Sequence, residues 1–137
     1  MIVVDTNVLA HLLLGAEFQS VCYAVCKKDP EWIAPVLWRS EFTNVLAKYM
    51  RADLLSPSDA NLTMMDALDL MENRDFFANP SMVIKLLSLS KVSAYNAEFI
   101  ALAIQTGNRL ISFDQKLINL FPDVAMHPSE FIASASS

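Results

Sequence analysis

The stretch MIVVD (residues 1–5) places the apolar run from Ile2 to Val4 directly before an acid, Asp5. A second stretch, LISFD (residues 110–114), repeats this arrangement near the other end of the chain and stops at Asp114. Short apolar runs are typical of strands that are buried on both faces of a parallel sheet. Ligands of open parallel sheets bind beyond the carboxyl ends of the strands, so both aspartates are expected at that edge.

The sequence between these stretches alternates predicted helices and short strands, which indicates an α/β layer fold. Helices are predicted over residues 6–14, 17–28, 37–50, 57 to about 72, 81–89, 94–106 and 115–120, with a last turn after Pro128. Further strands are predicted at residues 32–34, ended by Pro35, and at 124–126. Expected helix caps are Thr6 or Asn7, Ser56 or Ser58, and the C-terminal Gly107. Without repeats or a linker, the 137 residues are expected to form a single domain, residues 1–137.

The amino-acid composition excludes several classes of protein function. Hydrophobic residues make up 54% of the chain and charged residues 18%, as in a globular protein. The 2 glycines form no Gly-rich phosphate loop, which removes the usual ATP and dinucleotide motifs. Because no apolar run approaches the roughly 20 residues of a membrane helix and no signal peptide is recognised, a cytoplasmic protein without membrane contact is expected. Cys22 and Cys26 are expected to be reduced, packed thiols.

The net charge of −5 argues against a general DNA-coating protein, which needs an excess of basic residues. It is compatible with a nuclease, because acids clustered at a metal site contribute to such a deficit. Either Asp5 or Asp114 alone could equally be a helix N-cap after its strand. Together they favour a metal site, since hard divalent cations prefer oxygen ligands.

Glu41 lies inside the apolar stripe of its predicted helix, between Leu37 and Val45. A carboxylate on a packed face is destabilising unless it is paired or bound to a metal ion. Glu41 is therefore a candidate metal ligand. The alternative is a glutamate at the edge of the stripe that reaches water or pairs with Arg39 or Lys48.

The helix predicted over residues 94–106 supplies a further candidate. Asn96 shares the inner face of this helix with Phe99 and Ile100, although it could equally be a capping side chain. Glu98 is two residues further on, about 200° round the helix, and is expected to face elsewhere as a solvated acid.

Three segments together resemble a known family: VVDTNVLAHLL (residues 3–13), the isolated Glu41, and SAYNAEFIALAIQTGNRLISFDQKL (residues 93–117). They are similar to the PIN domain, and particularly to the VapC-type toxin ribonucleases. The resemblance covers nearly the whole chain, and its last motif is the most specific. It implies a three-layer fold with a central parallel sheet of about four or five strands and helices on both faces.

The resemblance also implies a metal-dependent endoribonuclease. The catalytic carboxylates would be Asp5, Glu41 and Asp114, and Asn96 stands where the family usually has a fourth acid among the metal ligands. In this interpretation one or two Mg²⁺ or Mn²⁺ orient and deprotonate water and neutralise charge on the phosphate. No nucleophilic side chain is needed, and His11 and His127 are interpreted as structural.

Supporting and RNA-binding roles follow from the same interpretation. The hydroxyls of Thr6 and Ser112, together with Asn7, are expected to support the site. Arg39 and Lys116 are close in sequence to the expected acids, so they are candidates to hold the RNA backbone. Solvated surface charge is the alternative for both.

The helix after Pro57 carries an apolar face formed by Leu62, Met65, Leu68 and Met71. Core packing is one interpretation of this face. The family resemblance suggests instead a homodimer surface or a groove that receives an antitoxin segment.

Three other functions share part of this pattern. The first is a PIN-like module that binds RNA or a partner without cleaving, because Asn96 replaces an acid. The second is a phosphatase of the haloacid dehalogenase type, but Asn7 stands where its second aspartate is required and no lysine motif matches. The third is a receiver-like phosphoacceptor, which would need paired acids at the first strand.

Overall fold

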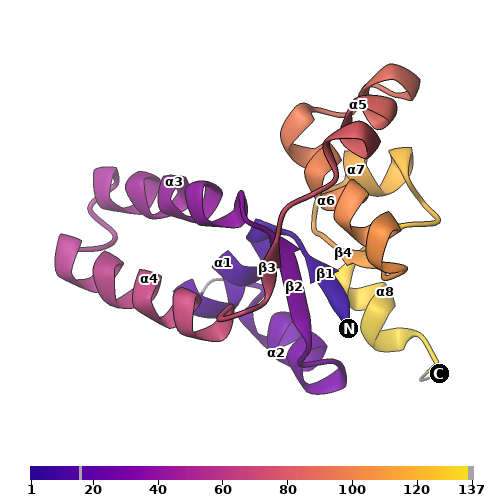
Figure 1. Cartoon of the computed structure of the whole chain (residues 1–137). Coiled ribbons are helices and arrows are strands. Elements are labelled where there is room, and N and C mark those ends of the chain that lie inside the picture. The colour runs from indigo at the N-terminus through magenta and orange to yellow at the C-terminus, as the bar shows by residue number, and fades with distance from the viewer. Residues whose placement is uncertain (16, 136–137) are drawn as a thin grey trace.

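Five parallel strands form the central sheet of the computed structural model, which describes residues 1–15 and 17–135 (Figure 1). The strands are β1 (Ile2–Val4), β2 (Trp32–Pro35), β3 (Asp75–Phe76), β4 (Leu110–Ile111) and β5 (Ala125–Met126), in the spatial order β3-β2-β1-β4-β5. Because every neighbouring pair is parallel, all five carboxyl ends lie at one edge. The strand order reverses at β1, which makes its carboxyl end the topological switch point where such sheets bind ligands.

Helices cover both faces of this sheet. Within the described residues they are α1 (Thr6–Leu14), α2 (Gln19–Lys28), α3 (Trp38–Arg51), α4 (Pro57–Leu70), α5 (Pro80–Leu89), α6 (Ala94–Thr106), α7 (Gln115–Leu120) and α8 (Pro128–Ala133). Helix α6 packs against β1, β2 and β4, whereas α1 packs with α2, α3 and α4 on the other side (Figure 1). The expected three-layer α/β fold with a parallel sheet is confirmed.

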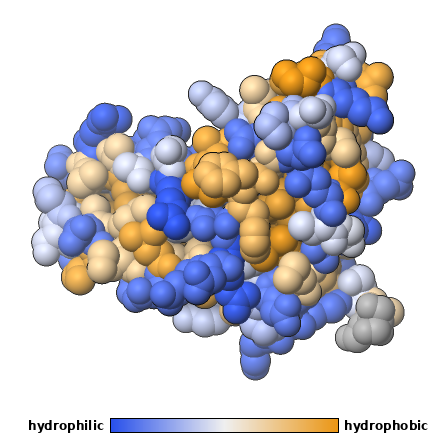
Figure 2. Space-filling view, in the orientation of Figure 1, coloured by the Kyte–Doolittle hydropathy of each residue, from blue (hydrophilic) through white to orange (hydrophobic). Residues whose placement is uncertain are grey.

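The helices α3 and α4 pack together as an antiparallel pair that extends away from the sheet (Figure 1). Figure 2 shows apolar residues gathered over α5, at the top of the molecule, where Ile84 and Leu89 are largely exposed.

No single helix of the described residues is long and apolar enough to cross a membrane. Helices α1 and α2, which are bent by 113° at their junction, meet the length and composition criteria only when they are taken as a pair.

Three details differ from the sequence-based expectations. The edge strand β3 was missed, because its two residues are not buried and carry no apolar run. Pro35 is the last residue of β2 and not its terminator, since the N–H groups that bond β3 belong to Ala34 and Val36. Helix α1 is capped by Asp5 and not by Thr6 or Asn7.

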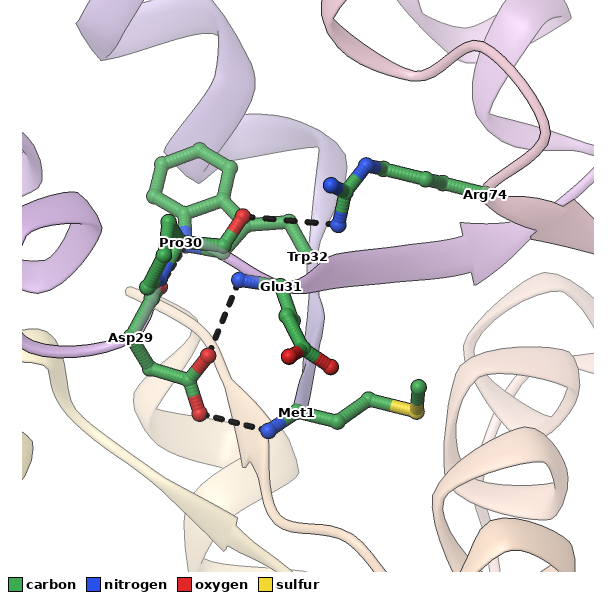
Figure 3. A network of polar contacts seen from close by, with 6 residues as sticks. All are labelled: Met1, Asp29, Pro30, Glu31, Trp32 and Arg74. Atoms are coloured by element: carbon green, nitrogen blue, oxygen red, sulfur yellow. Dashed lines mark hydrogen bonds and ion pairs between the residues drawn. The ribbon is translucent and has the colours of Figure 1, made fainter.

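A polar network closes the opposite, amino edge of the sheet around the turn between α2 and β2 (Figure 3). The amino group of Met1 pairs with Oδ2 of Asp29 at 2.7 Å, and the backbone N–H of Glu31 donates to Oδ1 at 2.9 Å. Arg74 donates to the carbonyl of Pro30 at 3.5 Å, which links the residue before β3 to the same turn. These contacts fix three neighbouring strands at the edge remote from Asp5.

Candidate active site

Asp5 lies at the carboxyl end of β1 and is held from two directions. The backbone N–H of Thr6 donates to Oδ1 at 2.8 Å, and the hydroxyl of Ser112 donates to Oδ2 at 2.7 Å. Asp5 is 7% exposed and Ser112 is fully buried. The carboxylate is therefore withdrawn from water and fixed in orientation by the first residue of α1 and by the residue that follows β4.

Ser112 also connects Asp5 to Asp114. The backbone N–H of Asp5 donates to the carbonyl of Ile111 at 2.9 Å, which aligns the ends of β1 and β4. The hydroxyl oxygen of Ser112 accepts from the backbone N–H of Asp114 at 3.0 Å. Asp114 in turn caps α7, where its Oδ1 accepts from the backbone N–H of Leu117 at 3.2 Å. Asp114 is thus an N-cap in the same polar cluster as Asp5.

Glu41 reaches this cluster from the first turns of α3. Burial of Trp38, Phe42 and Leu46 on one face of the helix orients the neighbouring Glu41, which is half-buried. The hydroxyl of Thr6 donates to Oε1 of Glu41 at 2.7 Å. Glu41 is therefore bound to the residue that also holds Asp5, and among the described residues it pairs with neither Arg39 nor Lys48.

The charges of these acids act on one another. Burial raises the pKa of Asp5 from 3.8 to about 6; the Ser112 hydrogen bond opposes this rise, whereas the charges of Glu41 and Asp114 add to it. Within the described residues, no lysine, arginine or histidine forms an ion pair with any of the three acids. The cluster is an arrangement of mutually repelling carboxylates that a cation would stabilise.

Glu98 is a residue that sequence reasoning placed elsewhere. Burial raises the pKa of Glu41, the Thr6 hydrogen bond opposes that rise, and the charge of Glu98 adds to it. Glu98 is half-buried rather than fully solvated. The expectation that Glu98 faces away as a solvated acid was wrong, because the start of α6 lies across from α3, where Tyr95 lines a pocket with Glu41.

Asn96 is half-buried in the first turn of α6. The cap of this helix is Ser93, whose hydroxyl accepts from the backbone N–H of Asn96 at 3.1 Å, so the capping interpretation of Asn96 is wrong. The neighbouring Tyr95 and Glu41 line a pocket of about 260 Å³ between α6 and α3. Asn96 thus belongs to a turn that borders the acid cluster.

Asn7 has a supporting position. Its Nδ2 is 3.5 Å from Oδ2 of Asp5, and its Oδ1 accepts from the backbone N–H of Phe113 at 3.4 Å. It therefore ties the first turn of α1 to the loop between Ser112 and Asp114.

The two basic candidates have different surroundings. Arg39 forms an ion pair with Asp75 at 2.7 Å. These two residues line a pocket of about 570 Å³, which is larger than the pocket beside Glu41 but is not lined by Asp5. Although burial raises the pKa of Asp75, the hydrogen bonds from Arg39 and Trp38 hold it below its ordinary value. Lys116 is exposed in the first turn of α7 and forms no ion pair within the described residues.

The donor chemistry of the cluster fits a hard divalent cation. Carboxylate oxygens from Asp5, Glu41 and Asp114 and the amide oxygen of Asn96 are ligands of the type that Mg²⁺ and Mn²⁺ prefer. Among the described residues, no three acid, His or Cys side chains lie close enough to enclose an ion by themselves. Water and substrate oxygens would complete the coordination, which is the usual manner in which proteins hold Mg²⁺.

Comparisons with known proteins agree with this arrangement. The PIN domain family model matches residues 2–121. The structure is similar to the crystal structure of PAE2754 from Pyrobaculum aerophilum, with a TM-score of 0.75 and 17% identity, over 96% of this chain and 92% of that chain. No curated protein matches significantly in sequence. The match spans most of the chain and includes Asp5, Glu41, Asn96 and Asp114, so the chain belongs to the PIN-domain family, whose members are generally nucleases.

Proposed function

We propose that this protein is a Mg²⁺- or Mn²⁺-dependent endoribonuclease whose carboxylates are Asp5, Glu41 and Asp114. The observation that carries the proposal is the environment of the Asp5 carboxylate. It is buried, held by two short hydrogen bonds, and close enough to two other acids that their charges raise its pKa. Neighbouring carboxylates repel one another and destabilise the folded protein unless a cation lies between them. Because the fold nevertheless brings these acids together, a catalytic role is favoured.

The side chains of the site have different roles in the proposed hydrolysis of a phosphodiester. Thr6 and Ser112 orient Glu41 and Asp5, so the acid oxygens are fixed before substrate binds. Asn7 and the Ser112 hydroxyl hold the loop that carries Asp114. A bound divalent cation would supply the positive charge that stabilises the phosphate during cleavage. Lys116, exposed beside Asp114, is proposed to hold the RNA backbone, and Arg39 is a second candidate.

The test is cleavage of single-stranded and structured RNA, with DNA of the same sequence as comparison. Mg²⁺, Mn²⁺ and EDTA are compared for the wild type and for Asp5→Asn, which keeps the shape of the buried side chain. Cleavage of RNA that requires a divalent cation and is lost in Asp5→Asn supports the proposal. An Asp5→Asn preparation that cleaves as fast as the wild type would show that the activity comes from a contaminant.

A second candidate is favoured by Asn96, which offers a neutral amide where the family usually has an acid. In that case the protein binds RNA or a partner without cleaving it. Titration with Mn²⁺ followed by calorimetry, together with the cleavage assay, separates the two functions. Metal-independent RNA binding without cleavage at any metal concentration identifies the binding module.

We also propose that the protein is the toxin of a toxin–antitoxin pair, acts in the cytoplasm and forms a homodimer. The support for an assembly surface is the α4 face: Leu62 is 61% exposed and Met65 is 51% exposed, although Met71 is buried in the core. Exposed apolar side chains on one helix face are typical of interaction sites. Light scattering of the wild type and of Leu62→Gln/Met65→Gln tests the dimer, and a wild-type monomer at high micromolar concentration removes it.

A further inference from the structure

Four aromatic rings gather at the carboxyl edge of the sheet, next to the acid cluster. Phe113 is at the centre, with ring centroids 4.8 Å from His11, 5.1 Å from Phe18 and 5.2 Å from His127. His11 also meets Phe18 edge to face at 5.1 Å. We call these four residues the aromatic cluster. They come from α1, the residue before α2, the end of β4 and the end of β5.

The backbone fixes the position of this cluster relative to the acids. Phe113 stands between Ser112, which binds Asp5, and Asp114. Its N–H is bonded to Asn7, and His11 is one helical turn after Asn7 on the same face of α1. The backbone N–H of Ser112 donates to the carbonyl of Met126 at 3.1 Å, which brings His127 beside Phe113. A molecule that contacts Asp5 or Asp114 at this edge is therefore adjacent to the cluster.

The cluster joins the core to the surface: Phe113 packs against the hydrophobic core, whereas Phe18 lies at the exposed side of the cluster. None of its rings belongs to the fully buried set, and Phe18 is 40% exposed. Its two imidazoles carry polar ring nitrogens. His127 Nδ1 accepts from the backbone N–H of Ser129 at 3.1 Å, whereas His11 has no hydrogen-bond partner among the described residues. His11 is half-buried, so part of its side chain is open to water.

The geometry points to a base-stacking platform: we infer that the exposed ring of Phe18, supported from behind by Phe113, stacks a nucleobase of single-stranded RNA next to the cleaved phosphate, with His11 and His127 alongside. Aromatic side chains stack bases of any sequence through their π faces, and unpaired RNA exposes those faces. The imidazole nitrogens would reach hydrogen-bonding groups on the base edge. This inference rests on the proposed ribonuclease function and adds to it a preference for unpaired over paired substrate.

The test measures base stacking directly and separately from cleavage. A short single-stranded RNA carries the fluorescent adenine analogue 2-aminopurine, whose emission falls when it stacks on an aromatic ring. Binding is measured in EDTA, with the same RNA made abasic at that position as comparison. The variants are Phe18→Leu and Phe113→Leu, and Tyr23→Leu is the matched control because Tyr23 is an exposed aromatic on α2 outside the cluster.

Quenching by the wild type and by Tyr23→Leu, with loss of quenching in Phe18→Leu and Phe113→Leu, is the expected result. The Kd should rise about 5- to 150-fold, the factor that corresponds to about 1–3 kcal/mol of base stacking. In the cleavage assay KM should rise while kcat changes little. Should Phe113→Leu fail to fold, Phe18→Leu carries the test alone, because Phe18 is substantially exposed.

Two outcomes overturn the inference and are distinguishable. If the wild type cleaves RNA but both variants bind, quench and turn over as it does, the platform is wrong and the ribonuclease function stands. If the wild type neither binds nor cleaves RNA under any metal condition, the proposed function fails and the platform fails with it.

Discussion

Thr6 holds two acids at once: its backbone N–H donates to Oδ1 of Asp5 at 2.8 Å, and its hydroxyl donates to Oε1 of Glu41 at 2.7 Å. Through this one residue the first turn of α1 couples the end of β1 to α3. Asp5 and Glu41 therefore keep a fixed relation that neither side chain could maintain alone.

Removing the hydroxyl of Thr6 should loosen Glu41 without disturbing Asp5. Thr6→Val keeps the shape of the buried side chain and its backbone N–H. We expect the pKa of Glu41 to rise further, because the lost hydrogen bond is one that lowers it. The acid limb of the pH profile for cleavage should move to higher pH, and stability should fall by about 1–3 kcal/mol. Thr6→Ser, which retains the hydroxyl, is the control and should keep the wild-type profile.

Glu41→Gln should separate catalysis from stability. The amide still accepts the Thr6 hydrogen bond but carries no charge. We expect cleavage to fall at least about a hundredfold, the scale at which the loss of a key catalytic group is felt. Stability in EDTA should stay level or rise, because repulsion from Glu98 and Asp5 is removed. Rates and thermal unfolding are measured on the same preparation, and a destabilised variant with unchanged turnover would assign Glu41 a structural role.

The buried Asp5 makes stability depend on pH. Since its pKa in the folded protein is about 6 and its ordinary value is 3.8, protonation of this group favours folding. That contribution is fully present below pH 3.8 and is lost as the pH rises through about 6. In EDTA, Asp5→Asn should therefore match the wild type in acid and exceed its stability by about 3 kcal/mol above neutrality. Urea unfolding at pH values of about 4 and about 8 checks this, and parallel pH curves would contradict it.

Asn96→Asp should raise the affinity for Mg²⁺. A carboxylate adds attraction for the cation that the neutral amide lacks. We expect the wild type to need high Mg²⁺ and to work better with Mn²⁺, and the variant to cleave more RNA at low Mg²⁺. Glu98→Gln is the comparison, because Glu98 already adds negative charge near Glu41. Cleavage is followed against metal concentration, and coincident curves for wild type and Asn96→Asp would mean that Asn96 does not face the cation.

Lys116 and Arg39 should differ as RNA contacts. Lys116→Ala should weaken RNA binding across sequences and lower the salt slope by about one unit. Arg39→Ala should have a smaller effect, because the Arg39 guanidinium is already paired with Asp75. Anisotropy titrations at several salt concentrations measure both slopes. Equal losses in the two variants would show that the Arg39 pair opens to bind phosphate.

The sequence predicted the central strands and most helices, because their signals are local. The apolar runs before Asp5 and Asp114, the cap at Ser56 and the glycine that ends α6 with a φ of 68° each appear within a few residues. Strand β3 has no such signal, since two residues on an edge are defined only by their partner strand. Its place in the sheet depends on tertiary contact and could not be read from residues 75–76.

The candidate site shows the same division. The positions of Asp5 and Asp114 followed from strands that end in acids, helix periodicity singled out Asn96, and the family resemblance added its expected place among the metal ligands. The double role of Thr6 and the field of Glu98 on Glu41 could not be predicted, because both depend on how α1, α3 and α6 pack. Helix periodicity gives the direction of a side chain relative to its own helix, whereas the charges that act on that side chain depend on how the neighbouring helices pack.

The hydrogen bond between Asp5 and Ser112 joins residues 107 positions apart. During synthesis the ribosome releases β1, α1 and α3 long before β4 can pair with β1. Until then Asp5 lacks the Ser112 hydrogen bond and has only its local contacts with Thr6 and Asn7, and Asp114 has not yet been made. Translation therefore delays the assembly of the acid cluster until β4 and the residues after it have been made, and we expect a product terminated before β4 to lack the proposed activity.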